Sequence, residues 1–234
     1  MSTTTPLIES RGRQFLRGMQ AVLPILLGVA PFGAIYGALA RQSGIPVPAA
    51  QSMSFIVFAG SSQFVATQLI QQAVPGLVIV LTIFVVNLRH ALYSASIASF
   101  VQKLNPAWKA GLAYLLTDEA YAVTITHYNE EGSSGNQHWF FLGAGLGLWT
   151  CWQISTALGV FLGAVIPASW SLDFALPLTF IALVVPALKD RAGTVAALVG
   201  GITALIAFSL PYRLGIIIAA FAGITAGLLA GGKK

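Results

Sequence analysis

Apolar runs long enough to cross a lipid bilayer recur along this chain from residue 19 to residue 230. A membrane-spanning helix needs about 20 mostly apolar residues. Only 8% of the 234 residues are charged and 56% are hydrophobic, a balance that would give a soluble domain of this size a large exposed apolar surface. The sequence therefore predicts an all-α integral membrane protein, with a cytoplasmic N-terminal tail (1–18) and a single polytopic membrane domain (19–234).

Hydropathy predicts six to eight membrane elements, of which two are interrupted. The element at 53–73 is broken by the polar stretch AGSSQ, and the one at 174–188 is short and contains Pro177 and Pro186. Both are expected to be broken or re-entrant helices. The full set of predicted elements is 19–40, 53–73, 76–101, 107–126, 139–166, 174–188, 193–210 and 214–230.

Loop charges favour re-entrance of the two interrupted elements. If both re-enter, nine of the 12 Lys and Arg residues lie on the cytoplasmic side, and only Arg41 and Arg213 lie outside, as the positive-inside rule prefers. Both termini are then cytoplasmic, and the acidic loop 127–138 faces out. Each half reads as a long helix, a broken element and two further helices, which predicts an inverted repeat with halves of roughly 19–126 and 139–230, as in many secondary transporters.

A polar cluster interrupts the third apolar run, in the stretch NLRHALYS at residues 87–94. An unpaired arginine at the centre of a membrane helix costs at least about 2.5 to 3.5 kcal/mol, so Arg89 needs a partner. The stretch LTDEAY (116–121) supplies Asp118 and Glu119 on the element that follows. A short connection joins the two elements, so we expect antiparallel neighbours with Arg89 and Asp118 at similar depth, forming an ion pair.

The pair can be static or functional. A static pair would only lock two helices, whereas a functional pair would bind a charged substrate or a proton. With Asn87 and His90 beside Arg89, the segment has more polar groups than one ion pair needs. Intramembrane ionisable groups are candidates for substrate and proton pathways. We therefore expect Asn87 and Arg89 to bind substrate, and His90, Asp118 or Glu119 to carry a coupling proton.

A second candidate site is FAGSSQF at residues 58–64. Gly60, Ser61 and Ser62 can interrupt a helix and free backbone groups, which a membrane tolerates only inside protein or beside a wet cavity. Together with Gln63 they are expected to bind a zwitterionic substrate, although small residues also serve close helix packing. In the first helix, Pro31 and Gly33 are expected to line the same cavity, because proline frees carbonyl groups.

Four motifs resemble those of one known family. PFG (31–33), FAGSSQF (58–64), NLRHALYS (87–94) and LTDEAY (116–121) are similar to the characteristic motifs of the AzlC family, the large subunit of branched-chain amino acid exporters. The resemblance implies a permease of the bacterial cytoplasmic (inner) membrane that works with a small AzlD-type membrane subunit. It also implies export of branched-chain or related amino acids, driven by the proton-motive force.

The sequence thus predicts a proton-coupled amino-acid exporter with the bilayer, an amino acid and the small subunit as partners. The alternative is a channel for protons, ions or a small solute that uses the same polar cluster. We expect no nucleic-acid partner, no cofactor and no catalytic residue, since nucleotide-binding and HExxH motifs are missing from the sequence. We also expect no metal site, because Cys151 is the only cysteine.

Overall fold

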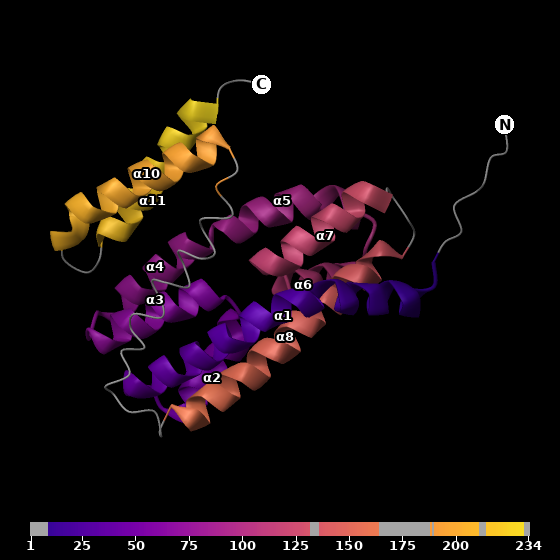
Figure 1. Ribbon diagram of the computed structural model, residues 1–234, viewed down its shortest axis with the longest axis horizontal. Coiled ribbons are helices and arrows are strands. Elements are labelled where there is room, and N and C mark those ends of the chain that lie inside the picture. The colour runs from indigo at the N-terminus through magenta and orange to yellow at the C-terminus, as the bar shows by residue number, and fades with distance from the viewer. Residues whose placement is uncertain (1–8, 132–135, 164–187, 189, 211–213, 232–234) are drawn as a thin grey trace. The chain divides into compact units, whose positions relative to one another are not determined.

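The computed structural model describes residues 9–131, 136–163, 188, 190–210 and 214–231, and within these ranges every regular element is helical (Figure 1). The prediction of an all-α integral membrane protein is therefore confirmed. In chain order the helices are α1 (Arg11–Gln42), α2 (Val47–Val57), α3 (Gly60–Gln71), α4 (Gly76–Asn87), α5 (Arg89–Val101), α6 (Pro106–Tyr114), α7 (Asp118–Glu131), α8 (Gln137–Leu162), α10 (Arg191–Ile206), the 3-10 helix η1 (Ala207–Ser209) and α11 (Leu214–Gly231).

Five helical stretches in the described residues are long and apolar enough to cross a membrane. One of them runs through α4 and α5, which only Leu88 separates. The predicted element at 174–188 lies outside the described residues apart from Leu188. The five stretches are Arg11–Gln42, Gly76–Val101, Gln137–Leu162, Arg191–Ser209 and Leu214–Gly231.

The chain forms two compact units, which are described separately. The first unit comprises Met1–Gln71 and Val86–Ala168, and the second comprises Gln72–Val85 and Ser169–Lys234. In the second unit α10 and α11 pack antiparallel through small residues: a Cβ atom on Gly223 would lie 2.8 Å from the carbonyl oxygen of Ala196, and Gly215 packs against Ala207. Such contacts let two membrane helices approach closely.

The first unit is built on a close contact between α1 and α8. Near their beginnings, a Cβ atom on Gly18 would overlap the backbone of Phe140, and further along, one on Gly37 would overlap the backbone of Thr156. Residue numbers rise together along the contact, so α1 and α8 run parallel. The predicted halves 19–126 and 139–230 require these two helices to be inverted counterparts, and this part of the prediction is corrected.

The first broken element forms a re-entrant hairpin of α2 and α3. Helix α2 starts near the end of α1, where the Tyr36 hydroxyl donates to the carbonyl oxygen of Ala50 (2.9 Å). The helix stops at Val57, and α3 then runs back along α1, because Gly60 lies beside Phe32 and Phe64 packs against Tyr36. The expected break is confirmed, at Phe58 and Ala59.

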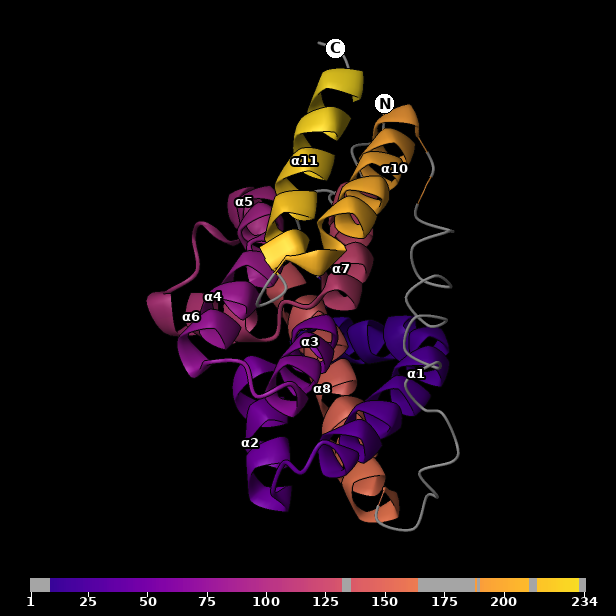
Figure 2. The ribbon, with the colours of Figure 1, turned by 90° about the vertical axis from the view of Figure 1, so that its left-hand side faces the viewer.

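A second hairpin, of α6 and α7, replaces the continuous helix that was predicted at 107–126. Trp108 at the start of α6 packs against Trp139 (ring centroids 5.0 Å apart), and Tyr114 at its end accepts a hydrogen bond from Trp149 (2.8 Å). Residues 115–117 are not helical, and α7 returns toward the beginning of α8, where the Tyr128 hydroxyl donates to the carbonyl oxygen of Gln137 (3.2 Å). The two hairpins thus reach the middle of α8 from opposite ends, as Figure 2 also shows.

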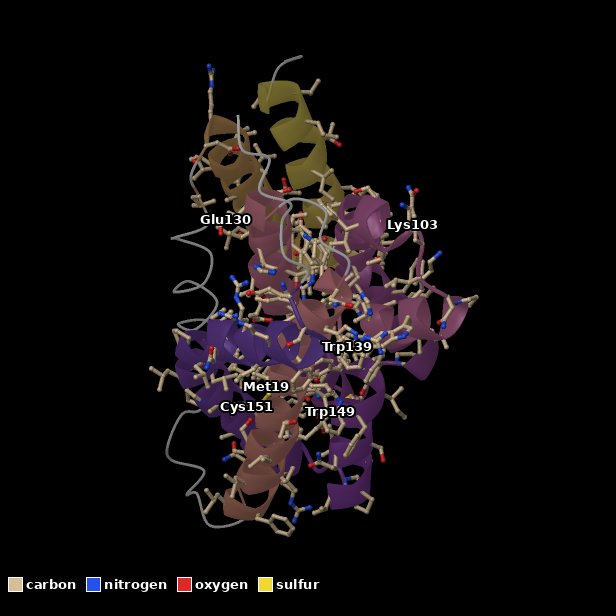
Figure 3. The ribbon with its side chains drawn as sticks, turned by 90° about the vertical axis from the view of Figure 1, so that its right-hand side faces the viewer. Met19, Lys103, Glu130, Trp139, Trp149 and Cys151 are labelled. Atoms are coloured by element: carbon tan, nitrogen blue, oxygen red, sulfur yellow. The ribbon has the colours of Figure 1, made fainter. Side chains whose placement is uncertain are left out.

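We call the end of the first unit where α1 and α8 begin the N-terminal face. The described ends of the acidic loop, at 127–131 and 136–138, lie at this face: Asn136 donates to the carbonyl oxygen of Glu9 (2.8 Å), and His127 lies 3.1 Å from Gln14. Figure 3 shows Lys103 and Glu130 on one side of the mid-helix residue Trp149. Both ends of the loop are therefore on the same side as the beginning of α1, which corrects the prediction that the loop faces away from the N-terminal tail.

Helix α5 runs toward the N-terminal face, opposite to α8. Phe100 near its end packs against Tyr128 (4.9 Å), which itself bonds to the first residue of α8. The first unit therefore contains two hairpins, α2–α3 and α6–α7, and the helices α5 and α8 that come after them run in opposite directions. The two hairpins, like these two helices, are inverted relative to each other, whereas α1 and α8, the first helices of the predicted halves, run parallel.

Candidate functional site

The candidate site lies where the two hairpin tips meet. At the first tip Phe58 adopts a left-handed conformation (φ 39°, ψ 44°) that ends α2, and α3 begins two residues later. The first N–H groups of a helix have no partner within the helix, and a membrane tolerates such groups only inside protein or beside a wet cavity. The tip therefore presents the backbone donors of Gly60 and Ser61 at mid-depth of α8, beside Trp152.

Arg89 connects the two tips. Its Nη1 atom lies 2.6 Å from Oδ2 of Asp118, and its Nη2 atom donates to Oγ of Ser61 (2.6 Å). One residue further along α3, Oγ of Ser62 donates to Oδ1 of Asn87 (2.6 Å). We call these five residues, Ser61, Ser62, Asn87, Arg89 and Asp118, the tip site.

The predicted ion pair between Arg89 and Asp118 is confirmed, but the helices that carry it are not antiparallel. The Tyr93 and Tyr121 rings stack at 4.5 Å, and Phe100 packs against Tyr128, so α5 and α7 run in the same direction. The pair forms because α7 starts at the second hairpin tip. Asp118 thus occupies the first turn of a helix, where the backbone dipole stabilises a carboxylate.

Several polar atoms in and beside the tip site form no hydrogen bond with the described residues. Nε of Arg89, Oδ1 of Asp118 and Nε2 of Gln63 are buried and find no hydrogen-bond partner among the described residues. A buried donor or acceptor without a partner costs about 1 to 3 kcal/mol. The site therefore offers two donors and one acceptor that a small ligand with both charges could satisfy.

The other predicted site residues divide into near and distant ones. His90 lies beside the cluster, with Nδ1 3.1 Å from the carbonyl oxygen of Asn87, and Glu119 follows Asp118 in the first turn of α7. Pro31 and Gly33 do not join it: Pro31 is exposed on α1, and Gly33 packs against Ser155 of α8.

An aromatic wall beside the first tip was not among the predicted site residues. Phe32 and Tyr36 of α1, Phe64 of α3 and Trp152 of α8 have ring centroids 4.5 to 6.1 Å apart. Nε1 of Trp152 donates to Oε1 of Gln63 (3.1 Å), so the wall also orients Gln63. Nothing in the sequence distinguishes these rings from ordinary packing aromatics.

The break before α7 did have a signal in the sequence. Thr117 accepts a hydrogen bond from the backbone N–H of Ala120 (3.3 Å), and two acidic residues follow it. A threonine before acidic residues is a typical helix start. The motif LTDEAY therefore encodes a helix N-terminus as well as a charge.

Comparisons with known proteins identify relatives of this chain. Residues 24–166 match the family described as AzlC protein. Inner membrane protein YgaZ of Escherichia coli is 27% identical over 98% of this chain and 94% of that protein. An uncharacterized membrane protein of Archaeoglobus fulgidus is 36% identical over 92% of this chain and 94% of that protein.

A third relative carries a functional name. The branched-chain amino acid transport protein AzlC of Bacillus subtilis is 25% identical over 69% of this chain and 63% of that protein. No solved structure matches the chain. Because the family match covers more than half of the sequence and contains both hairpins, this multi-pass membrane protein belongs to the AzlC family.

Proposed function

We propose that the chain is a secondary transporter that exports branched-chain or related apolar amino acids across the bacterial cytoplasmic membrane. The family membership and the name of the Bacillus subtilis relative support amino-acid transport. The observation that carries the proposal is the Arg89–Asp118 pair at the meeting point of two helix N-termini. A zwitterion matches this arrangement because it carries one group for each partner.

The two charged groups of the substrate would replace the ion pair between Arg89 and Asp118. Its carboxylate would bind Arg89 and the first N–H groups of α3, as anions do at helix N-termini. Its ammonium group would bind Asp118, whose Oδ1 atom is free of other described partners. Its apolar side chain would lie against the aromatic wall, where burial of each methylene contributes about 0.8 kcal/mol.

Proton coupling requires a group that exchanges its proton during the cycle. Asp118, Glu119 and His90 are the titratable side chains at or beside the tip site with that capacity. When the substrate leaves, a proton would take the place of its ammonium group on Asp118 until the pair with Arg89 forms again. Export would then follow the proton-motive force, with the small AzlD-type subunit as partner.

Charge supports a cytoplasmic N-terminal face. Among the described Lys and Arg residues of the first unit, only Arg41 lies at the end of α1, and Arg89 lies in the tip site. The others gather at the N-terminal face, at positions Arg11, Arg13, Arg17, Lys103 and Lys109. The positive-inside rule therefore favours a cytoplasmic beginning of α1.

The test is efflux from cells preloaded with branched-chain dipeptides, with the chain alone or with its small partner, and with or without a protonophore. We expect partner-dependent, protonophore-sensitive loss of valine, leucine or isoleucine. Asp118→Asn should abolish coupled efflux, whereas Asp190→Asn, which keeps a good N-cap for α10, should not. Normal coupled efflux by Asp118→Asn would remove this carboxylate from the mechanism, and flux that neither saturates nor exchanges labelled substrate would favour a channel.

A further inference from the structure

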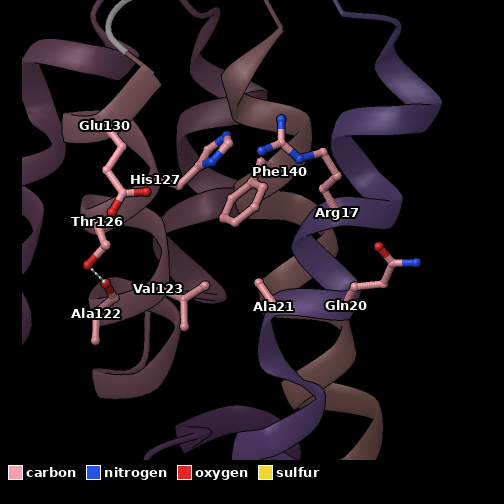
Figure 4. A pocket seen from close by; sticks show the side chains of 9 residues that line it. All are labelled: Arg17, Gln20, Ala21, Ala122, Val123, Thr126, His127, Glu130 and Phe140. Atoms are coloured by element: carbon pink, nitrogen blue, oxygen red, sulfur yellow. Dashed lines mark hydrogen bonds between the residues drawn. The ribbon is translucent and has the colours of Figure 1, made fainter.

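A cavity lies in the first unit, apart from the tip site. It has a volume of about 620 Å³ and lies between the beginnings of α1 and α8 and the end of α7 (Figure 4). Its position is the N-terminal face, where the α6–α7 hairpin begins and ends. None of the five residues of the tip site lines this cavity.

Opposite charges stand on opposite walls of this cavity. Figure 4 shows Arg17 extending from α1 on one side and Glu130 from α7 on the other, with His127 and Phe140 between them. His127 stacks on Phe140 with ring centroids 3.7 Å apart and planes within 10°. This stacked pair forms a flat apolar surface between the two charges.

Arg17 already pairs with a carboxylate, which shows the chemistry that it offers. Its Nη1 atom lies 3.0 Å from Oε2 of Glu9, and the fork of N–H donors on a guanidinium matches the carboxylate of an amino acid equally well. Below the charged groups, Ala21 and Val123 add small apolar walls. The cavity therefore combines a cation, an anion and an apolar surface, the same three features that the tip site and the aromatic wall provide together.

The α7 wall of the cavity leads toward the tip site. Val123, His127 and Glu130 follow one another at helical spacing, and Glu119 lies one turn before Val123 on the same helix. Residues separated by three or four positions share a helix face. A ligand in the cavity would thus lie on the face of α7 that continues to its acidic N-terminus.

We propose that this cavity is a loading site for a zwitterionic amino acid with an apolar side chain. Arg17 binds the carboxylate, Glu130 binds the ammonium group, and the stacked rings of His127 and Phe140 receive the side chain. The proposal rests on the proposed function, because it supplies the site from which the substrate moves to the hairpin tips. It adds a second binding site with its own charged residues.

Protection of an introduced cysteine tests the loading site. In a Cys151→Ser background, Ala122→Cys places one thiol on the cavity wall, and Ala21→Cys does so from α1 if the first variant fails to fold. Lys103→Cys, exposed at the N-terminal face, is the matched control and identifies the vesicle orientation that exposes this face. A membrane-impermeant thiol reagent is applied to vesicles that contain the protein.

Leucine should protect the cavity cysteine but not the control. At about ten times its dissociation constant, leucine leaves about one site in eleven free, so labelling should slow about tenfold. Leucinamide and 4-methylpentanoate, which lack one charge each, should protect far less. Arg17→Gln or Glu130→Gln should abolish protection at the same leucine concentration, because a charge-assisted bond is lost.

The tip-site variant Arg89→Gln separates this proposal from the proposed function. It should abolish transport in the same vesicles and leave protection of Ala122→Cys intact. Protection without transport in the Cys151→Ser background would overturn the proposed function alone. The loading site is overturned if leucine gives no protection at concentrations that saturate transport, if Arg89→Gln also removes protection, or if the single-charge analogues protect equally.

Discussion

The α2–α3 hairpin reaches the middle of the first unit with a neutral tip, whereas the α6–α7 hairpin reaches it with an acidic one. Both contain a short non-helical stretch, at Phe58–Ala59 in one and at residues 115–117 in the other. In both, a new helix starts at the tip and presents its N-terminus to the centre. The first tip supplies hydroxyl and N–H groups through Gly60 and Ser61, and the second supplies the carboxylate of Asp118.

This difference shows why an arginine lies between the tips. Two helix N-termini, those of α3 and α7, converge there, and each carries a partial positive charge. Arg89 adds a full positive charge that only the acidic tip can balance, while the neutral tip contributes the Ser61 oxygen as an acceptor. The second tip thus provides charge balance, and the first provides neutral groups for recognition.

The largest effect should come from Arg89→Ala, which removes the residue that joins the tips. Asp118, whose side chain is 40% exposed, is left without its cation inside a membrane protein, where a charged side chain costs about 2.5 to 3.5 kcal/mol. Transport should fall to background and thermal stability in nanodiscs should drop. The double variant Arg89→Gln/Asp118→Asn should recover stability but not transport; if Arg89→Ala alone is as stable as the parent, the pair does not hold the tips together.

Ser61→Ala should have the next largest effect and tests the neutral tip. It removes one charge-assisted hydrogen bond to Arg89, which contributes about 1.5 to 3 kcal/mol. We expect transport to fall about 10-fold to 150-fold, with a smaller loss of stability, because the Arg89–Asp118 pair remains. The matched control is Ser96→Ala on α5, whose hydroxyl accepts only from the exposed Tyr121 hydroxyl; equal effects of the two variants would contradict a special role for the neutral tip.

The sequence predicted the tip site better than the path of the chain. A charge in an apolar run must find a counter-charge, and Asp118 and Glu119 were the only acidic residues within a predicted element, so the pair followed from physics alone. The break at AGSSQ could be predicted because glycine and serine readily interrupt a membrane helix. The break before Asp118 contains neither glycine nor proline, and its threonine cap is visible only when helix starts inside apolar runs are sought.

The direction of the helices could not be predicted from residue types. Glycines such as Gly18 and Gly37 allow close approach in either direction, so nothing in them distinguishes a parallel from an antiparallel α1–α8 contact. Once the second hairpin was treated as a full crossing, every later element changed sides, which placed the acidic loop on the wrong face. One missed helix cap therefore accounts for the wrong face of the loop and for the wrong direction of α8.

Gly145→Ala should show how tightly the acidic tip is held against α8. A Cβ atom at this position would lie 2.8 Å from Cβ of Leu115, in the non-helical stretch of the tip. Overpacking of this kind costs about 1 to 3 kcal/mol, so unfolding should occur at lower temperature and transport should fall. Gly111→Ala, where a new Cβ meets nothing within 4 Å, is the control; if both variants behave like the parent, the second tip is not fixed by this contact.

The smallest effect is expected for Thr117→Val, which preserves shape and removes the hydroxyl that caps α7. Loss of an N-cap costs about 1 kcal/mol, and here it would weaken the start of the helix that carries Asp118. Because the carboxylate depends on this start for its position, transport should fall more than stability does. Thr225→Val on α11, whose hydroxyl donates to the carbonyl of Phe221 within its own helix, should leave both unchanged. If Thr117→Val lowers stability and leaves transport at the parental level, the cap stabilises the fold but does not set the position of Asp118. The function of the acidic tip then depends less on its backbone conformation than that of the neutral tip does.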